Sequence, residues 1–258
     1  MKPLSHDVDA VMIDLDGVVY EGDALIEGAE AAVRALRAQG LKLLFLTNNS
    51  ARNAREIAEK LGRLGLAASP AEVLSTCDFA PVALRDAGLG LREGVFVVGS
   101  PSLRAGLDAA GLRRCEGPEA ELVLVAMDTT FCYQTLDAAL QPLRRGAHLW
   151  ACNLDGAFPA GPGRWAPGCG ALVGALTAAS GRAVDRVLGK PSPAYGEAAL
   201  ARLAVPPHRA VMLGDTWAAD IVMAQSLGIT PVLIGPRSAH PEVASSPSLA
   251  HWVSSQLR

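Results

Sequence analysis

Short runs of Val, Ile and Leu alternate with segments of helical spacing along the chain, and this alternation constrains the fold most strongly. A run at 10–13 is followed by apolar residues spaced as on a helix at 29–36, and then by a second run at 41–46. The further strand candidates are 95–98, 122–127, 148–152, 210–213 and 231–234. Strands that are apolar on both faces are typical of parallel sheets covered by helices. The sequence therefore predicts an α/β fold of repeated strand–helix units.

Composition narrows the class of protein. Of the 258 residues, 50% are hydrophobic, which is enough for a sizeable core. The formal charge of −3 and the scattered Lys and Arg side chains argue against a nucleic-acid partner. No apolar run approaches the roughly 20 residues of a membrane-spanning helix, and the first residues lack the apolar stretch of a signal peptide. We therefore expect a cytoplasmic protein that binds neither nucleic acid nor a membrane.

The cysteines and histidines give no sign of a disulfide framework or a zinc site. The cysteines are odd in number and form no Cys-x-x-Cys pair, and the histidines are dispersed without i, i+4 spacing. The simplest interpretation of the cysteines is buried apolar filler. They are Cys77, Cys115, Cys132, Cys152 and Cys169.

A Gly- and Pro-rich stretch at 156–170 interrupts the middle of the chain and predicts an ordered loop without regular structure. A strand pattern precedes it, and a helical pattern follows it at 171–179. These features indicate a smaller α/β unit at 80–186, inserted into a main fold made of 1–79 and 187–258.

Two aspartates follow the first strand pattern and are the first candidates for chemistry. In a parallel sheet, ligands bind beyond the carboxyl ends of the strands, which is where Asp14 and Asp16 lie. Asp14 is the predicted nucleophile, since a carboxylate can attack phosphorus and form an aspartyl-phosphate. Asp16 projects to the same side of an extended backbone and is the predicted general acid and base. Gly17 lets backbone N–H groups approach the phosphoryl oxygens. The pair Asp7 and Asp9 precedes its strand and would face the opposite edge.

A second acidic group lies far downstream, in Asp215 and Asp220. Phosphate monoesters and carboxylates repel each other, so the reaction needs a divalent cation, and Mg²⁺ prefers oxygen ligands. Asp14, Asp16 and Asp215 are the predicted ligands. Asp220 is a candidate for orienting Asp215 or metal-bound water, although an acid in the first turn of a helix is favoured by the helix dipole alone.

Thr47, Asn48 and Lys190 complete the predicted set. The Thr47 hydroxyl and the Asn48 backbone N–H follow a strand and suit an anionic oxygen. Lys190 brings a positive charge to the transferring phosphoryl group and would keep Asp14 ionised. Each feature alone is better explained by a helix cap or a surface charge. Their common order at strand ends favours one reaction.

These motifs resemble the haloacid dehalogenase-like superfamily, within it the NagD-like, p-nitrophenylphosphatase-like branch, over nearly the whole chain. The similar segments are 14–20, 45–50, 189–193 and 214–221, together with 153–155, Pro159 and 167–172. The resemblance implies a Rossmann-like core with an α/β cap inserted between the second and third motifs, because only that interval is long enough. It also implies closure of the cap over the site, most substrate contacts from the cap, and self-association through the cap as a homodimer.

This chain departs from the pattern of its relatives at two positions, and several residues of its cap are candidates for substrate contacts. Ala219 stands where relatives usually have threonine, and Trp217 where they have smaller or polar residues, which affects the surroundings of Asp220. Loop structure explains the candidate cap contacts about as well as substrate binding does. These candidates are Met127, Asp128, Asn153, Asp155, Arg164 and Trp165.

The leading hypothesis is a Mg²⁺-dependent phosphatase of small phosphorylated metabolites, such as nucleoside monophosphates, sugar phosphates, phosphoglycolate, pyridoxal phosphate or p-nitrophenyl phosphate. A phosphomutase or phosphotransferase of the same superfamily would use the same nucleophile. A non-enzymatic phospho-receiver would also form an aspartyl-phosphate, but it is about half this length and carries its acidic pair and phosphoacceptor on different strands. A binding protein with a dead site is disfavoured by the intact set of residues.

Overall fold

The computed structural model describes residues 8–160, 163–235 and 241–256. By its internal contacts the chain divides into two compact units. Unit 1 comprises Met1–Thr47, Ile57–Leu74 and Lys190–Arg258, and unit 2 comprises Asn48–Glu56 and Ser75–Gly189. The division into functional domains at 79/80 and 186/187 stays a prediction.

Unit 1 is built on a six-stranded sheet of order β14-β13-β12-β1-β4-β5. The pairings of β1 with β4 and β12, of β12 with β13, and of β13 with β14 are parallel. Ile13 pairs with both Phe45 and Leu213, so β1, β4 and β12 end at the same edge. The strands are β1 (Ala10–Ile13), β4 (Lys42–Thr47), β5 (Val73–Ser75), β12 (Ala210–Gly214), β13 (Thr230–Ile234) and β14 (Ala244–Ser246). This edge is the one that the sequence predicts for the site.

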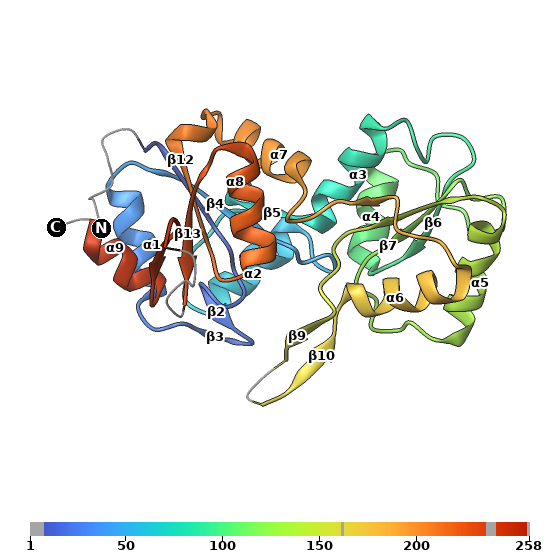
Figure 1. Cartoon of the computed structure of the whole chain (residues 1–258), viewed down its shortest axis with the longest axis horizontal. Helices are drawn as coiled ribbons and strands as arrows, with labels where there is room; N and C mark the ends of the chain where they lie inside the picture. Colours follow the sequence, from blue (N-terminus) through green and yellow to red (C-terminus); the bar gives the residue numbers. More distant parts are fainter. Residues whose placement is uncertain (1–7, 161–162, 236–240, 257–258) are drawn as a thin grey trace. The chain divides into compact units, whose positions relative to one another are not determined.

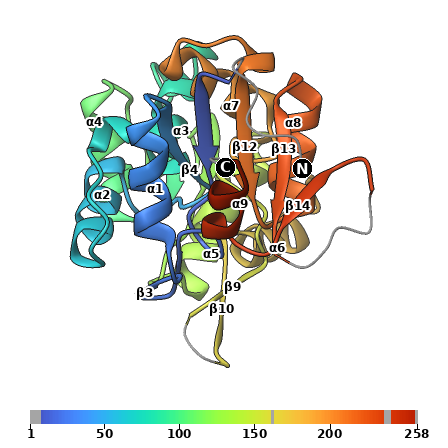
Figure 2. The same cartoon turned by 90° about the vertical axis from the view of Figure 1, so that its left-hand side faces the viewer.

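Helices cover both faces of this sheet, with α1 and α9 on one side and α7 and α8 on the other (Figure 1). Helix α1 (Ala29–Ala38) buries Ala29, Ala32, Val33 and Leu36, as its spacing predicts. The other helices on the two faces of this sheet are α7 (Pro193–Leu203), α8 (Val222–Leu227) and α9 (Leu249–Gln256). In Figure 2 the side that carries α1 and α9 faces the viewer. Helix α2 (Ala54–Arg63) begins in unit 2 and continues in unit 1. Short elements are the β2–β3 hairpin (Tyr20–Glu21, Ala24–Leu25) and the 3₁₀ turns Pro70–Glu72 and Pro207–Arg209.

Unit 2 contains a parallel four-stranded sheet of order β11-β8-β7-β6, with α5 and α6 packed on one face and α3 and α4 on the other (Figure 1). Its core joins alternate residues of these strands, such as Val123 and Leu149, to apolar residues of α5 and α6 such as Leu143 and Leu176. The strands are β6 (Val95–Val98), β7 (Leu122–Val125), β8 (His148–Ala151) and β11 (Arg186–Val187). The helices are α3 (Thr76–Asp86), α4 (Pro101–Ala109), α5 (Tyr133–Arg144) and α6 (Cys169–Ser180). The predicted α/β class and parallel sheets are confirmed.

Two expectations about local structure are wrong. The stretch at 156–170 contains an antiparallel pair, β9 (Ala157–Pro159) and β10 (Trp165–Pro167), instead of an irregular loop. Both strands of a two-stranded ribbon are edges, where proline without an N–H is tolerated, so three-residue strands form despite the breakers. Cys132 is exposed, unlike the other cysteines, because it precedes α5 at the surface of unit 2.

Among the residues that the structure describes, none of the helices has the length and apolar character that a membrane span requires.

Candidate active site

The segment after β1 folds into a compact turn that presents two carboxylates. The Asp14 N–H donates to Leu213 O at 2.8 Å and so continues the strand pairing by one residue. The carbonyl of Leu15 then accepts from three N–H groups, those of residues 18, 19 and 20. Asp14 is buried, whereas Asp16 is exposed to solvent. The predicted nucleophile and the predicted acid therefore lie in different surroundings, although only one residue separates them.

A buried ammonium group joins two carboxylates at the strand ends. Nζ of Lys190 lies 2.6 Å from Oδ1 of Asp14, 2.6 Å from Oδ1 of Asp220 and 3.1 Å from the carbonyl oxygen of Leu46. Burial alone would lower the pKa of Lys190, but the charges of Asp14 and Asp220 outweigh burial and raise this pKa. Lys190 is therefore charged at neutral pH and is held between the two acids.

Three carboxylates lie close together at this point. One oxygen from each of them lies within 4.8 Å of the other two, and they belong to Asp14, Asp215 and Asp220. Burial raises the pKa of Asp14, and the charges of Asp220 and Asp215 add to this effect while Lys190 opposes it. Burial also raises the pKa of Asp215. A single ammonium, 2.6 Å from both Asp14 and Asp220, cannot balance three carboxylates. The donor set therefore suits a hard divalent cation.

Two glycines allow these carboxylates to approach the backbone. A Cβ on Gly17, whose φ is +83°, would lie 2.1 Å from Oδ2 of Asp215, and a Cβ on Gly214 would lie 2.2 Å from Cγ of Asp220. Asp220 itself lies in a π-helical turn, Trp217–Ile221, where its Oδ2 accepts from the Thr216 N–H at 3.0 Å. This turn orients the side chain toward Lys190. It is not readable from the sequence, and π-turns of this kind are frequent at functional sites.

Thr47 is the last residue of β4 and Asn48 follows it, and the two residues fall in different units. The Thr47 side chain is buried, and its carbonyl accepts from the Tyr195 hydroxyl at 2.8 Å within unit 1. Within unit 2, the Asn48 amide donates to Oδ2 of Asp155 at 3.2 Å, and its carbonyl accepts from Nδ2 of Asn153 at 2.7 Å. Three residues predicted for the site, Asn48, Asn153 and Asp155, therefore lie together.

The remaining cap candidates are separate from this group. Asp128 accepts from the N–H and the hydroxyl of Thr130, at 2.8 Å and 2.6 Å, as in a local turn. The Met127 N–H donates to Oγ of Ser50 at 2.9 Å. Arg164 and Trp165 are exposed at the start of β10, with 69% of Trp165 accessible. The structure gives these residues no joint geometry for a substrate.

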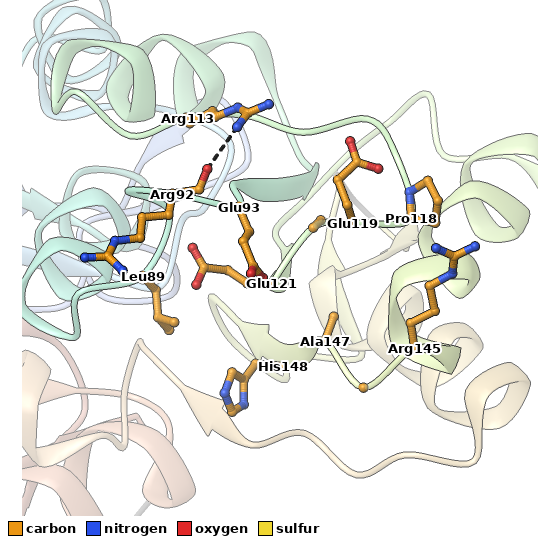
Figure 3. A pocket seen from close by; sticks show the side chains of 12 residues that line it. Leu89, Arg92, Glu93, Arg113, Pro118, Glu119, Glu121, Arg145, Ala147 and His148 are labelled. Carbon is orange, nitrogen blue, oxygen red and sulfur yellow. Dashed lines mark hydrogen bonds between the residues drawn. The ribbon is translucent and has the colours of Figure 1, made fainter.

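A hollow of about 700 Å³ lies elsewhere in unit 2 (Figure 3). Its walls carry charges of both signs, from Arg92, Arg113, Arg145, Glu93, Glu119 and Glu121. Several of these groups already serve the wall itself, since Glu121 accepts from the Gly90 N–H at 2.7 Å and Arg113 donates to Arg92 O at 2.9 Å. None of the predicted site residues lines this hollow, so it is not the candidate active site.

The sequence of this chain matches the models of two related protein families. The model of the haloacid dehalogenase-like hydrolases matches residues 11–113, and the HAD-hydrolase-like model matches residues 187–257. Together the two matches span more than half of the chain. The first contains Asp14, and the second contains Lys190, Asp215 and Asp220. The chain belongs to the haloacid dehalogenase-like hydrolase family.

Individual relatives indicate which kind of hydrolase this chain resembles. Human glycerol-3-phosphate phosphatase is 35% identical over 258 residues, which cover 90% of this chain and 80% of the relative. The p-nitrophenyl phosphatase from Archaeoglobus fulgidus has a TM-score of 0.86 at 28% identity, with 96% of this chain and 99% of that chain covered. A glycerol phosphate phosphatase from Mycobacterium tuberculosis, solved with magnesium, has a TM-score of 0.85 at 31% identity, with 97% and 78% covered. The predicted resemblance to the NagD-like branch is confirmed, and the hydrolase is a phosphoric monoester hydrolase.

Two residues of this hydrolase near the site were missed by sequence reasoning. The Tyr20 hydroxyl donates to Oδ2 of Asp16 at 3.1 Å, and Nζ of Lys60 lies 3.7 Å from the centroid of the Tyr20 ring. Tyr20 belongs to the segment that carries the first motif, which was its only signal. Lys60 lies about forty residues from Asp16 on another element, so that nothing in the sequence connected the two.

Proposed function

We propose that this hydrolase releases phosphate from small phosphorylated metabolites through an aspartyl-phosphate on Asp14, with Mg²⁺ as its cofactor. The observation that carries the proposal is the cluster of the buried Lys190, Asp14 and Asp220 with the exposed Asp215, at the carboxyl ends of β1 and β12. Such a cluster combines a nucleophilic carboxylate with the positive charge that a phosphate monoester requires.

The residues divide the reaction into two steps. An Asp14 oxygen attacks phosphorus, the bond to the substrate oxygen breaks, and Asp16 gives its proton to the departing alcohol. Asp16 then removes a proton from the water that attacks the aspartyl-phosphate, which returns Asp14 as a carboxylate and yields inorganic phosphate. Lys190, 2.6 Å from Asp14, opposes the effect of burial and favours the ionised nucleophile. Gly17 and the Thr47 hydroxyl are proposed to bind phosphoryl oxygens.

Oxygen atoms of Asp14, Asp215 and Asp220 would hold the cation. When bound, Mg²⁺ neutralises the repulsion between the phosphate and these carboxylates. We therefore propose that Asp220 binds the cation itself and does not only orient a neighbouring ligand. Asp16, which contacts Tyr20, remains a predicted ligand. The relative from M. tuberculosis that was solved with magnesium supports this choice of cation.

The relatives support a small phosphate ester as substrate. Two of them are a glycerol-3-phosphate phosphatase and a p-nitrophenyl phosphatase. We therefore place glycerol phosphate beside the nucleoside monophosphates, sugar phosphates, phosphoglycolate and pyridoxal phosphate as substrates to test. The part of Asn48 and of the cap candidates in recognition stays a prediction. So do the closing cap, the homodimer and the cytoplasmic location.

The test is phosphate release from a panel of these esters with and without Mg²⁺, for the wild type and for Asp215→Asn. We expect release that requires Mg²⁺ and that falls at least 100-fold in the variant, on the order of one lost catalytic group. Asp86→Asn is the matched control, since Asp86 is exposed at the end of α3 and is not one of the predicted site residues. Negligible release by the wild type across the panel would contradict the proposal. Transfer of phosphate to a second hydroxyl would identify a phosphomutase, and a long-lived phosphorylated protein would identify a receiver.

A further inference from the structure

A buried phenol joins the ends of two strands of unit 1. Tyr195 is fully buried at the third position of α7, and its hydroxyl donates to Thr47 O and to Leu74 O, at 2.8 Å each. A hydroxyl has a single hydrogen, so the two carbonyl groups share it. Thr47 is the last residue of β4, and Leu74 lies in the neighbouring strand, β5. One side chain therefore holds the backbone of both strands near their ends.

Both carbonyl groups lie where the chain leaves unit 1. Thr47 and Leu74 are each the last residue of unit 1 before the chain enters unit 2. The pairing of β4 with β1 ends at Phe45, opposite Ile13, and so stops two residues before Thr47. The Tyr195 hydroxyl therefore holds Thr47 at a point that the pairing with β1 no longer reaches.

The segment that carries Tyr195 also carries the ammonium group of the site. Lys190 lies five residues earlier, and its Nζ donates to the carbonyl of Leu46 at 3.1 Å. Two successive carbonyl groups of β4, those of Leu46 and Thr47, thus accept from side chains of the segment 190–195. These two contacts fix the segment against the end of the strand, and with it they fix Thr47 relative to the ammonium group.

We propose that Tyr195 is a positioning residue, which holds Thr47 so that the Thr47 hydroxyl binds an oxygen of the phosphoryl group. This inference rests on the proposed function, in which that hydroxyl is one of the phosphoryl donors. A hydrogen-bond donor stabilises developing charge best when it is in place before the reaction. A displacement of about 1 Å can cost about 100-fold in rate. Tyr195 acts through the backbone of Thr47 and does not itself contact the substrate.

A purely structural role for Tyr195 predicts a different set of constants. If its hydroxyl only stabilised the fold, its loss would lower the Tm and the fraction of active molecules. The observed kcat would then fall, while KM and the inhibition constant of inorganic phosphate would stay the same. Displacement of Thr47 weakens the contact with the phosphoryl group itself, so it raises the inhibition constant of phosphate.

The experiment measures the inhibition constant of inorganic phosphate for the wild type and for Tyr195→Phe, with p-nitrophenyl phosphate as substrate in the presence of Mg²⁺. Rates are taken at a temperature at which circular dichroism shows both proteins to be folded. We expect the constant to rise about 5-fold, on the order of one weakened hydrogen bond. Since all esters share the phosphoryl group, kcat/KM should fall by the same factor with glycerol phosphate and p-nitrophenyl phosphate. An unchanged inhibition constant would overturn the proposal.

Ser246→Ala is the matched control. It removes the hydroxyl of a buried residue of unit 1 that donates to a backbone carbonyl, that of Ser248, at 3.2 Å. Ser246 lies in β14, at the opposite edge of the sheet from β5. Its loss should leave the inhibition constant of phosphate unchanged, whatever the effect on the Tm. A rise equal to that of Tyr195→Phe would show that any buried hydroxyl has this effect, and the positioning role would be wrong.

A double substitution separates positioning from other effects. Thr47→Val removes the hydroxyl that Tyr195 is proposed to position, and it should raise the inhibition constant at least as much as Tyr195→Phe does. In this background Tyr195→Phe should cause no further rise, whereas a full additional rise of about 5-fold would contradict the inference. If Thr47→Val leaves the constant unchanged, Tyr195 has no phosphoryl donor to position, and the inference fails while phosphate release stands. Failure of the proposed function looks different, since the wild type would then release no phosphate from either ester.

Discussion

At the scale of single residues, the cluster depends on one ammonium group between two buried acids. Lys190 is 3% exposed and lies 2.6 Å from both Asp14 and Asp220. Removing one partner of a buried ion pair leaves charge without compensation in a poorly solvated place. This feature explains how Asp14 and Asp220 can both be buried near each other in a folded protein.

Lys190→Met should therefore destabilise the fold by about 3–5 kcal/mol, the usual cost of breaking a buried pair. Urea unfolding at neutral pH measures this free energy, and added Mg²⁺ should restore part of it by replacing the lost positive charge. Lys42→Met is the control, because Lys42 donates to the carbonyl of Leu203 near the surface. A loss no larger than that of the control would show that the cluster does not need Lys190.

The cysteines should differ sharply in reactivity. A hydrogen bond with the Thr135 hydroxyl lowers the pKa of the exposed Cys132 thiol, and backbone N–H groups of α5 add to the effect. Burial raises the pKa of Cys77 to about 12 and that of Cys169 to about 11, and it raises that of Cys152 well above its usual value. Since the thiolate is the reactive form, iodoacetamide at pH 7.5 should first modify the peptide that contains Cys132.

Peptide mass spectrometry over time gives the order of modification, with Cys132→Ser as the control. Fast labelling of Cys77 or Cys152 in the native protein would contradict the burial of these thiols.

At the scale of elements, a side-chain pair joins the starts of two neighbouring strands. Asp9 accepts from the guanidinium of Arg209, with one contact at 2.6 Å, and the Asp9 N–H donates to Arg209 O at 2.9 Å. The hydrogen bond to Arg209 lowers the pKa of Asp9 below 3.8. These residues precede β1 and β12, whose opposite ends carry Asp14 and Asp215.

Because the pKa of Asp9 is lower in the folded state than in the unfolded state, ionised Asp9 stabilises the fold at pH values above its unfolded-state pKa, near 3.8. This stabilisation is lost as the pH falls through the folded-state pKa. Asp9→Asn should therefore lower the Tm at pH 7, and its difference from the wild type should shrink below about pH 4. Thermal unfolding between pH 7 and pH 3 tests this prediction. A difference that is constant or grows toward low pH would show that the pair does not contribute through charge.

The elements also show what sequence patterns can and cannot predict. The longer strands of both sheets and the burial of α1 follow from hydrophobic patterns, which are a local property of the chain. The short strands β5, β11 and β14 were not predicted, because two or three residues leave no pattern to read. The β9–β10 ribbon has three-residue strands among prolines and glycines, so its pairing leaves no periodicity to read. The π-turn that carries Asp220 depends on the contact of its side chain with the Thr216 N–H and on the lack of a Cβ at Gly214. Such contacts form only in the folded chain.

At the scale of the whole molecule, the site joins segments that are far apart in sequence. The order of Asp14, Thr47, Lys190 and Asp215 at strand ends allowed their convergence to be predicted, because parallel strands share one edge. The assignment of Asn48 to unit 2 and the packing of Lys60 on Tyr20 could not be predicted, since both depend on which helices and loops meet in three dimensions.

Binding of the cation should stabilise the folded molecule as a whole. A ligand that binds only the native state stabilises it by about 2.7 kcal/mol at 100 times its Kd. We therefore expect the Tm to rise with Mg²⁺ concentration in the wild type and to be nearly unchanged by Mg²⁺ in Asp215→Asn. Differential scanning calorimetry with Mg²⁺ and with K⁺ at matched ionic strength measures this effect. An equal rise in both proteins would indicate binding outside the cluster.

The aspartyl-phosphate mechanism is tested best by finding the phosphate on the protein itself. The wild type is mixed with Mg²⁺ and p-nitrophenyl phosphate, quenched in acid within the first turnover, digested and analysed by mass spectrometry. We expect phosphate on the peptide that contains Asp14, at Asp14, and no phosphorylated peptide from Asp14→Asn. Phosphate on another residue, or undiminished turnover by Asp14→Asn, would contradict it.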